Sequence, residues 1–400
     1  MSTTSLQLSR EERLLLRLAR VRPEPQPEPH ELDGIDAKRF LFLAARLGNF
    51  ALLAKRFLKL ATDLDDELRA RTESNLAYYR VREGFALADL KELTARLAAS
   101  GAPLVLLKGA AYNRFIYPRG GLRNYQDIDV LLDAAAVAKA REILRAMGYA
   151  EQQSIEGSVD MVKHLGGRMP SLLIELHTQL VHHHEYPYYR AELALDEGRL
   201  MERSEERLVD DTAVRILHPA DELFYSVVHF FFHHDFAGLK YHSDVNALLT
   251  DPARPLDLDE AVTMARAARA GYAVGLTLLV QRAIFGADAV PERLVRELAP
   301  RGLRCKALRA CLPPPERAAL GEGRVAGHPA KVLTAPGLLA PLGLGLRWLF
   351  PGRRFLMDFY EVGADGWRSR YHLRYAGAIA KKAYVRLIRG LPDRRSPAVR

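Results

Sequence analysis

Hydrophobic positions follow two different periods along this chain, and the changes of period divide it into three parts. From about residue 36 to residue 100, apolar side chains recur three or four positions apart, which is typical of helices that bury one face. Ser100-Gly101 ends the last of these predicted helices. Beyond residue 102 the apolar runs are short, and beyond Pro219 the helical spacing returns. The sequence therefore predicts a small α/β unit between two helical regions.

The positions of the predicted elements follow from where these patterns begin and end. Strands are predicted at 103–107, 128–132, 149–154 and 172–176, with a helix at 134–147. In the second helical region, helices are predicted at 220–235, 238–250, 257–270, 272–285 and 290–311. The uncharged segment 332–346 contains two prolines and three glycines, which predicts a loop or a surface-seeking segment and not a membrane span.

Composition shifts suggest five consecutive regions. A short N-terminal helix and a proline-rich linker are expected first, then a helical region, the α/β core, a second helical region, and finally a Gly/Pro-rich segment with a basic helical tail. The expected boundaries are 1–30, 31–101, 102–215, 216–315 and 316–400.

Bulk composition excludes several classes of protein. Apolar residues make up 48% of the 400 residues, which is ordinary for a soluble globular chain. The two cysteines, Cys305 and Cys311, form neither a disulfide framework nor a metal cage, and they fit a reducing compartment. Neither a signal peptide nor an apolar run long enough to cross a membrane is expected. These features predict a cytoplasmic protein.

The net charge of +9 is concentrated at the C-terminal end. Residues 341–400 contain 13 Lys and Arg against 4 Asp and Glu, so the rest of the chain is neutral. A basic helical tail predicts docking to an anionic surface, such as the inner face of a membrane, or to an acidic partner. A solvated, arginine-rich helix is an equally good interpretation. Nucleic acid is not expected as a partner, because the positive charge is not on the folded core.

The segment Asp127-Ile128-Asp129 carries the most chemical information. On a strand, alternate side chains share a face, so Asp127 and Asp129 point one way and Ile128 points into the core. In Ile174-Glu175-Leu176-His177, Glu175 and His177 share a face in the same way. If the two strands are neighbours, Glu175 completes a cluster of three carboxylates. Single acidic pairs at strand ends also occur without any catalytic role, so the surrounding residues matter.

Three clustered carboxylates suit Mg²⁺ or Mn²⁺, because these cations take oxygen ligands and share them with phosphates. We therefore predict that Asp127, Asp129 and Glu175 are both metal ligands and catalytic residues. The cation neutralises charge that develops during in-line displacement on a nucleoside triphosphate, and Glu175 is placed to take a proton from an attacking hydroxyl. By itself, Asp129→Asn is expected to abolish turnover and to relieve repulsion between like charges.

Residues that precede the acidic pair add phosphate-binding chemistry. Lys108 and Gly109 lie between a predicted strand and a helical turn, where a glycine lets the backbone approach a phosphate. Arg123 comes four residues before Asp127 and is expected to be an exposed cation that binds triphosphate. The alternative interpretations are a plain turn and a solvated arginine. Together with His177, these residues form the predicted cofactor-binding set.

Histidines invite a competing prediction of a zinc site. They cluster with two acidic residues around His182–His184, Glu185, His229, His233, His234 and Asp235. No H-E-x-x-H motif occurs, so polar histidines near a helix end are the favoured interpretation. His177 differs because it shares a face with Glu175, where it either orients the carboxylate, binds substrate or makes a structural hydrogen bond. Asp244 is interpreted either as lining the cleft or as a helix cap or first-turn residue, and the second interpretation is favoured.

Three runs together resemble a known family. L-L-K-G-A-A, then Y-P-R-G-G-L-R-N-Y-Q-D-I-D-V-L-L, then I-E-L-H-T-Q-L, is similar to the bacterial uncharacterised nucleotidyltransferase family of the polymerase-β-like superfamily. The resemblance extends over roughly residues 35–310. It implies an α+β fold, with a small mixed-sheet nucleotidyltransferase core embedded between N-terminal helices and a C-terminal helical domain. It matches Gly109 to the turn glycine, Asp127 and Asp129 to the metal pair, and Glu175 to the third carboxylate.

The resemblance implies transfer of a nucleoside monophosphate from a nucleoside triphosphate, with ATP favoured, to a hydroxyl or phosphate of an unidentified acceptor. The acceptor is a small molecule, a sugar or a protein. The sequence departs from the wider superfamily by having Lys-Gly instead of Gly-Ser at the turn, with 17 residues between Gly109 and Asp127. This departure motivates the alternative of a catalytically degenerate protein that binds nucleotide or a partner as a regulator.

Overall fold

A computed structural model describes the chain from residue 8 to residue 378, apart from short gaps. The gaps are 119, 156, 167–170, 182–192, 235, 322–326, 338, 354–355, 358–359 and 361–367. His182–His184, Glu185, Asp235 and the end of the basic tail lie outside the described residues. What the sequence predicts for them stays a prediction.

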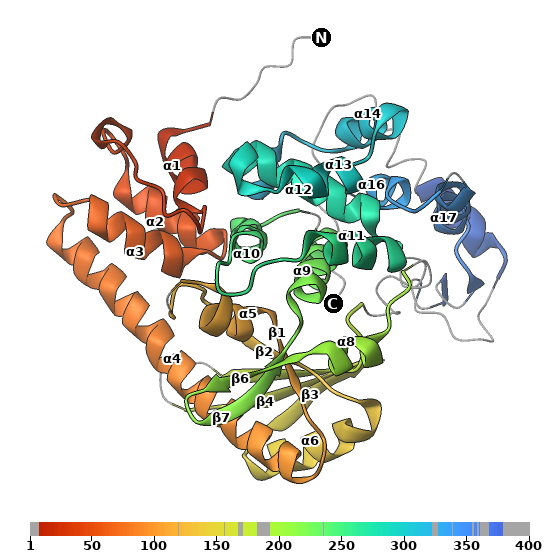
Figure 1. Ribbon diagram of the computed structural model, residues 1–400, viewed down its shortest axis with the longest axis horizontal. Helices are drawn as coiled ribbons and strands as arrows, with labels where there is room; N and C mark the ends of the chain where they lie inside the picture. The colour runs from red at the N-terminus through yellow and green to blue at the C-terminus, as the bar shows by residue number, and fades with distance from the viewer. Residues whose placement is uncertain are drawn as a thin grey trace.

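A seven-stranded mixed sheet forms the centre of the molecule, in the order β3-β4-β5-β2-β1-β7-β6 (Figure 1). The strands are β1 (Val105–Leu107), β2 (Asp127–Leu131), β3 (Ala150–Ile155), β4 (Ser158–Lys163), β5 (Leu172–His177), β6 (Glu205–Val209) and β7 (Thr212–Ile216). The pairs β2–β5 and β1–β7 are parallel, and the other pairs are antiparallel. Four strands lie where the sequence predicts them, whereas β4, β6 and β7 were not predicted.

The two faces of the sheet differ because side chains alternate along each strand. Leu106, Val130 and Ile174 point to one face and belong to the main hydrophobic core. That face is covered by α4 (Asp66–Ala99) and α6 (Ala134–Ala146), which contact each other. The opposite face carries a smaller apolar cluster that includes Leu107 and Leu131. The acidic residues of β2 and β5 belong to this second face.

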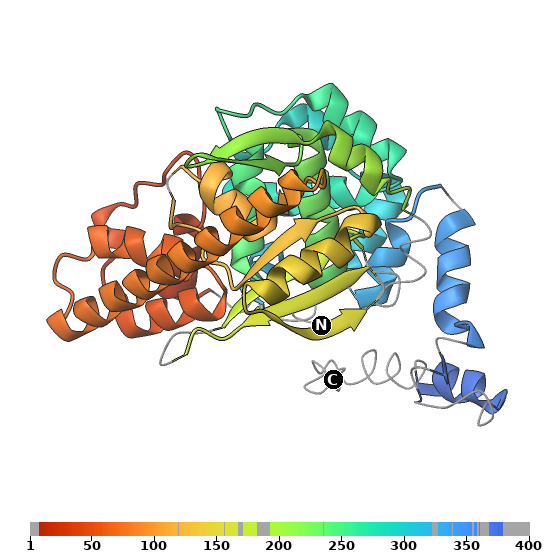
Figure 2. The same ribbon diagram turned by 90° about the horizontal axis from the view of Figure 1, so that it is seen from below.

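Helices from both the N-terminal and the C-terminal parts of the chain pack around the sheet. The N-terminal helices are α1 (Arg10–Leu18), α2 (Ala37–Arg46), α3 (Phe50–Leu60) and α4. The later helices include α8 (Glu197–Arg203), α9 (Pro219–His234), α10 (Leu239–Leu249), α11 (Leu258–Ala267), α12 (Gly271–Phe285), α13 (Glu292–Leu298), α14 (Gly302–Cys311), α16 (Gly327–Leu333) and α17 (Leu339–Leu349). Figure 1 shows α1–α3 grouped on one side, with α4 running from them along the sheet. In Figure 2, α17 stands apart from the body of the molecule.

Two predictions about helices are wrong. The single helix expected at 290–311 is two helices, α13 and α14, because Pro300 disfavours helical geometry in Ala299 and ends the first of them. The segment 332–346 is largely helical, since it ends α16 and supplies most of α17. Pro341 lies in the first turn of α17, where a missing N–H costs nothing. No helix in the described part of the chain is long and apolar enough to span a bilayer.

Candidate active site

The register between β2 and β5 brings the predicted acidic residues together. These strands are parallel neighbours, and Asp129 lies directly opposite Glu175. Paired residues on adjacent strands point to the same face, and so do residues two apart on one strand. Asp127 and His177 therefore project from the same face as Asp129 and Glu175. The sequence predicted this arrangement on the condition that the strands were neighbours, and that condition is met.

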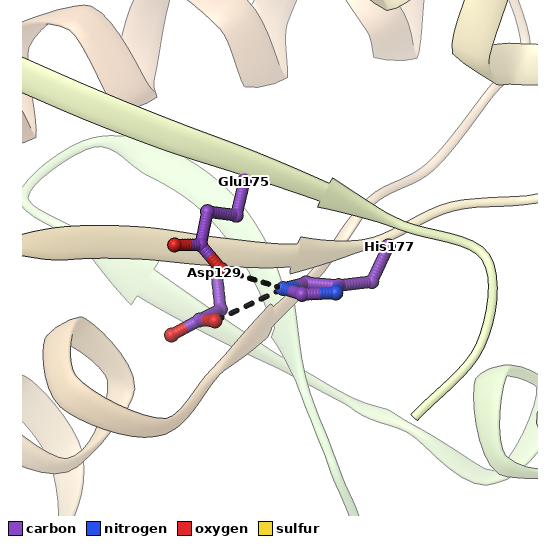
Figure 3. Close-up of side chains that lie close together, drawn as sticks. All are labelled: Asp129, Glu175 and His177. Carbon is purple, nitrogen blue, oxygen red and sulfur yellow. Dashed lines mark hydrogen bonds and ion pairs between the residues drawn. The ribbon is translucent and has the colours of Figure 1, made fainter. Parts of the chain in front are cut away.

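The imidazole of His177 points between two carboxylates, as Figure 3 shows. Its Nε2 atom is 3.0 Å from Asp129 Oδ1 and 3.4 Å from Glu175 Oε2. Asp129 and His177 are almost entirely buried, whereas 24% of the Glu175 side chain is exposed. One ligand atom from each of the three residues lies within 4.8 Å of the other two. Among the described residues, Asp127 is not part of a three-ligand group of this kind.

Lys108 also binds Asp129, from the turn that follows β1. Its Nζ atom donates to Asp129 Oδ1 at 2.9 Å and lies 5.6 Å from the centre of the Tyr225 ring. The backbone of Lys108 has φ +41°, a left-handed conformation that costs about 1–2 kcal/mol for a residue with a side chain. Strain of this kind is retained where surrounding contacts hold it, and it often marks functional sites.

Gly109 has a packing role in this turn. A Cβ atom added to it would come within 2.6 Å of Tyr125 Cβ, which is too close for any side chain. Tyr125 belongs to the segment that leads into β2, and the buried guanidinium of Arg82 holds that segment by donating to the carbonyls of Tyr125 and Gln126. The glycine therefore allows the turn after β1 to lie against the entrance to the acidic strand.

Charges in this cluster perturb one another. Burial alone raises the pKa of Asp129, but Lys108 and His177 outweigh it and hold that pKa well below its usual range. Burial lowers the pKa of Lys108, yet Asp129 raises it well above its ordinary value. Burial followed by repulsion from Asp129 and Glu175 raises the pKa of Asp127. Neutralising Asp127 is therefore expected to relieve repulsion between like charges. Neutralising Asp129 is not expected to do so, because its neighbours stabilise the charge of Asp129.

Asp160 is a fourth carboxylate that the sequence analysis missed. It lies on β4, directly opposite Glu175, and so projects from the same face. Burial and the charge of Glu175 raise its pKa, and Asp129 and Asp127 add to this effect. The signal in the sequence was the alternation in Ser158–Lys163, where Val159 and Met161 are buried. Val162 breaks this alternation and three of the six side chains are polar, so the segment gives only a weak strand signal.

Arg123 is not an exposed cation, and this expectation is wrong. The residue is 4% exposed, and its guanidinium binds both carboxylate oxygens of Asp244, with N···O distances of 2.8 to 3.0 Å. Tyr117 Oη donates to the same carboxylate at 2.8 Å. Asp244 lies in the second turn of α10, so the predicted cap or first-turn role is wrong too. The pair fastens α10 to the loop that precedes β2.

Fastening α10 places two further side chains near the acidic cluster. Burial and Arg123 lower the pKa of Lys240, while Asp127 and Asp129 partly oppose this shift. The Tyr241 ring stacks on His234 with their centres 4.0 Å apart. Neither Lys240 nor Tyr241 was expected at the site, because a residue 113 positions after Asp127 gives no local signal of proximity.

The described histidines of α9 contact one another, and the other residues of the competing zinc prediction lie outside the described part of the chain. His229 Nε2 and His234 Nε2 are 3.1 Å apart, and the rings of His229 and His233 stack. Among the described residues, no group of three ligands includes them. Burial and neighbouring positive charge lower the pKa of His229 well below its ordinary value, so this ring is neutral.

The donor set of the acidic cluster fits a divalent cation. Carboxylate oxygens suit hard cations and imidazole nitrogen suits borderline ones, and Asp129, Glu175 and His177 offer both. The site thus defines a class of protein: a mixed-sheet α/β protein with a buried acidic cluster and a lysine beside it. Residues 33–286 match the family described as uncharacterised nucleotidyltransferase, and the chain belongs to that family. No curated protein and no solved structure matches the chain.

Proposed function

We propose that this protein transfers a nucleoside monophosphate from a nucleoside triphosphate, ATP being the favoured donor, to a hydroxyl or phosphate oxygen of an acceptor. The observation that carries the proposal is the parallel register that sets Asp129 opposite Glu175, with Asp127 and His177 on the same face. Membership of a nucleotidyltransferase family supports the class of reaction. A bound cation would neutralise the repulsion that contributes to the raised pKa of Asp127.

Asp129 and Glu175 would hold Mg²⁺ or Mn²⁺, with Asp127 or His177 as the third protein ligand. The cation supplies neutralisation of phosphate charge when it is bound. Lys108 supplies a buried positive charge from the same side and would contact the phosphates of the donor. Its ammonium group is a compact point charge on a flexible stem, so it can move from a carboxylate to a phosphate without rebuilding the fold.

The proposed reaction is an in-line displacement at the α-phosphorus. The acceptor oxygen forms a bond to this phosphorus, the bond to the bridging oxygen breaks, and pyrophosphate leaves with the electron pair. A carboxylate of the cluster receives the proton of the acceptor hydroxyl. We assign this proton to Asp127 and not to Glu175, which the sequence suggested, because Glu175 belongs to the group of three mutually close ligands, whereas Asp127 shares the face of the site and stands outside that group.

A thermal unfolding series tests this proposal without knowledge of the acceptor. The wild-type chain is heated with ATP, GTP, CTP or UTP, each with Mg²⁺, with Mn²⁺ or with EDTA. A ligand that binds only the folded state raises the midpoint by mass action. We expect a cation-dependent rise with ATP that Asp129→Asn abolishes. A midpoint that no nucleotide shifts at millimolar concentration would contradict the proposal.

A second candidate function is that of a degenerate transferase that binds nucleotide or a partner as a regulator. The contact that favours it is the ion pair between Lys108 and Asp129, since the ammonium occupies a carboxylate that a cation would need. Nucleotide binding without any pyrophosphate release, in the presence of candidate acceptors, supports the regulator. Pyrophosphate release that requires Asp129 supports the enzyme.

The identity of the acceptor and the docking of the tail to a membrane are two separate proposals. A small molecule, a sugar and a protein side chain are all chemically compatible with the reaction. We retain docking of the basic tail to an anionic membrane as a proposal that rests on the charge of residues 341–400 alone. Pelleting with anionic vesicles, at low and high salt, tests it.

A further inference from the structure

We propose that His177 is itself a metal ligand, and that it makes this site select Mn²⁺ over Mg²⁺. This inference rests on the proposed function, because it concerns the cation of the same site. It starts from the observation that the three mutually close ligand atoms belong to Asp129, Glu175 and His177. The sequence predicted Asp127 as the third ligand. The structure gives that place to an imidazole.

The distances around His177 fit adjacent corners of an octahedron. Two adjacent ligands at about 2.1 Å from one cation are about 3 Å apart, from simple right-angle geometry and typical bond lengths. His177 Nε2 is 3.0 Å from Asp129 Oδ1 and 3.4 Å from Glu175 Oε2. The Nε2 atom therefore faces both carboxylates at distances that would let all three groups share one cation. Cation binding needs an unprotonated Nε2, so a proton carried there passes to solvent.

The strand geometry holds this arrangement in place without help from loops. Glu175 and His177 are two apart on β5, and Asp129 lies opposite Glu175 on the adjacent parallel strand. All three ligands therefore come from two hydrogen-bonded strands in the interior of the sheet. Burial of Asp129 and His177 limits the number of water molecules that can complete the coordination shell. A site of this kind is already close to its bound geometry before the cation arrives.

The chemistry of the donor set decides which cation is preferred. Mg²⁺ keeps an oxygen shell and several waters, and it takes imidazole poorly. Imidazole nitrogen suits the later first-row transition cations rather than Mg²⁺, and Mn²⁺ is the member of the first row that most readily accepts carboxylate oxygens as well. A site with the ligands Asp127, Asp129 and Glu175 would contain oxygen only and would not prefer Mn²⁺ to this degree. The identity of the third ligand therefore determines which cation the site prefers.

The test measures cation binding to the full-length chain in the absence of nucleotide. Free Mn²⁺ is titrated by electron paramagnetic resonance, and Mg²⁺ by competition. Pulsed resonance on the Mn²⁺-loaded protein then detects nitrogen bonded to the metal. We expect a ¹⁴N coupling in the wild type that disappears in His177→Asn, with Mn²⁺ affinity lower by about tenfold or more. Mg²⁺ affinity should change by less than about threefold, because an oxygen-binding cation gains little from the imidazole.

Two control variants frame this result. His164→Asn removes an exposed histidine that contacts Ser171, away from the cluster, and should leave the coupling and both affinities unchanged. Asp127→Asn should keep the coupling and the preference for Mn²⁺, because that carboxylate lies outside the group of three. If His177→Asn does not fold, His177→Gln replaces it. The nitrogen coupling can be sought in the wild-type protein even if no His177 variant folds.

The outcomes separate this inference from the proposed function. Bound Mn²⁺ without nitrogen coupling, or a coupling that survives in His177→Asn, overturns the inference and leaves nucleotidyl transfer standing. His177 would then only orient the two carboxylates. Failure of both Mn²⁺ and Mg²⁺ to bind overturns the inference and removes the cation from the proposed function as well. Coupling that only the substitution of His177 abolishes supports the inference.

Discussion

Two buried groups of charges lie near the start of β2, one anchored in the loop that precedes the strand and one on the strand itself, and they are built on opposite rules. Arg123 and Asp244 match one cation to one carboxylate, with three hydrogen bonds between them. The acidic cluster sets Asp127, Asp129 and Glu175 against Lys108 and His177, with Asp160 nearby. The balanced pair is complete as it stands, whereas the cluster has carboxylates that its own cations do not satisfy.

The difference teaches which of the two groups is available for chemistry. A buried ion pair with all its donors and acceptors used contributes geometry, and breaking it leaves an uncompensated charge. A cluster whose pKa values are pushed apart, with Asp127 raised and Asp129 lowered, keeps groups ready to bind a cation or a proton. Each group contains a buried residue that the sequence predicted as part of the site. Arg123 fastens α10, whereas Asp129 belongs to the cluster that can bind a cation.

The largest expected effect is on the acidic cluster. Asp129→Asn should reduce nucleotidyl transfer by at least about a thousandfold, since it removes charge that a preorganised site directs at the cation. Initial rates of pyrophosphate release measure this loss. The same substitution should lower the stability of the cation-free protein, because Lys108 loses its partner, whereas Asp127→Asn should raise it. Urea unfolding measures both free energies of unfolding. If both substitutions changed the stability in the same direction, the contrast between Asp127 and Asp129 would be contradicted.

Breaking the balanced pair of Arg123 and Asp244 should lower the stability of the protein. Arg123→Met leaves Asp244 buried without its partner, and we expect a loss of about 3–5 kcal/mol in the free energy of unfolding. The double variant Arg123→Met/Asp244→Leu removes both charges and should recover part of this loss. A single variant that keeps its stability but binds triphosphate more weakly would return Arg123 to the phosphate-binding role that the sequence suggested.

Glu222 offers a pH-dependent test beside the balanced pair. It is fully buried in the first turn of α9, and burial raises its pKa from 4.5 to about 7. The folded protein therefore keeps a proton that the unfolded chain releases between these two values. The stability that neutral Glu222 contributes is fully present below pH 4.5 and is lost as the pH rises through about 7.

Glu222→Gln removes this titration while keeping a similar shape. We expect the variant to be more stable than the wild type at pH 8, by about 3 kcal/mol from the size of the shift, and to show a flatter dependence between pH 4.5 and 7. Urea unfolding midpoints measured across this range check the prediction. Parallel curves for the two proteins would mean that Glu222 does not titrate with the fold.

The smallest expected effect concerns the lysine that shares Asp129 with a cation. Lys108→Met frees Asp129 Oδ1 from an ammonium group and should tighten Mn²⁺ binding by about tenfold, or about 1.4 kcal/mol. Nucleotide binding should weaken in the same variant. Lys91→Met, which removes a lysine paired with Asp210 and Asp211, is the matched control and should change neither. Unchanged Mn²⁺ affinity in Lys108→Met would show that the lysine does not compete with the cation.

The sequence by itself determined the class of fold, the positions of four strands and most of the helices, and three acidic residues of the candidate site, Asp127, Asp129 and Glu175. Local periodicity carries this information, because alternate residues on a strand share a face and residues three or four apart share a helix face. The motif Asp127-Ile128-Asp129 and the pair Glu175 and His177 are local features of this kind. These features lie within residues 33–286, which match the family.

Only the tertiary structure decided which side chains meet. The order of the strands made Asp129 and Glu175 neighbours and added Asp160 from a strand whose polar pattern was not recognised. The partner of Arg123 lies 121 residues away, and contacts at that separation leave no local periodicity in the sequence. A side chain that is free in one fold is paired in another, so whether a cation holds a phosphate or fastens a helix depends on the packing of distant segments.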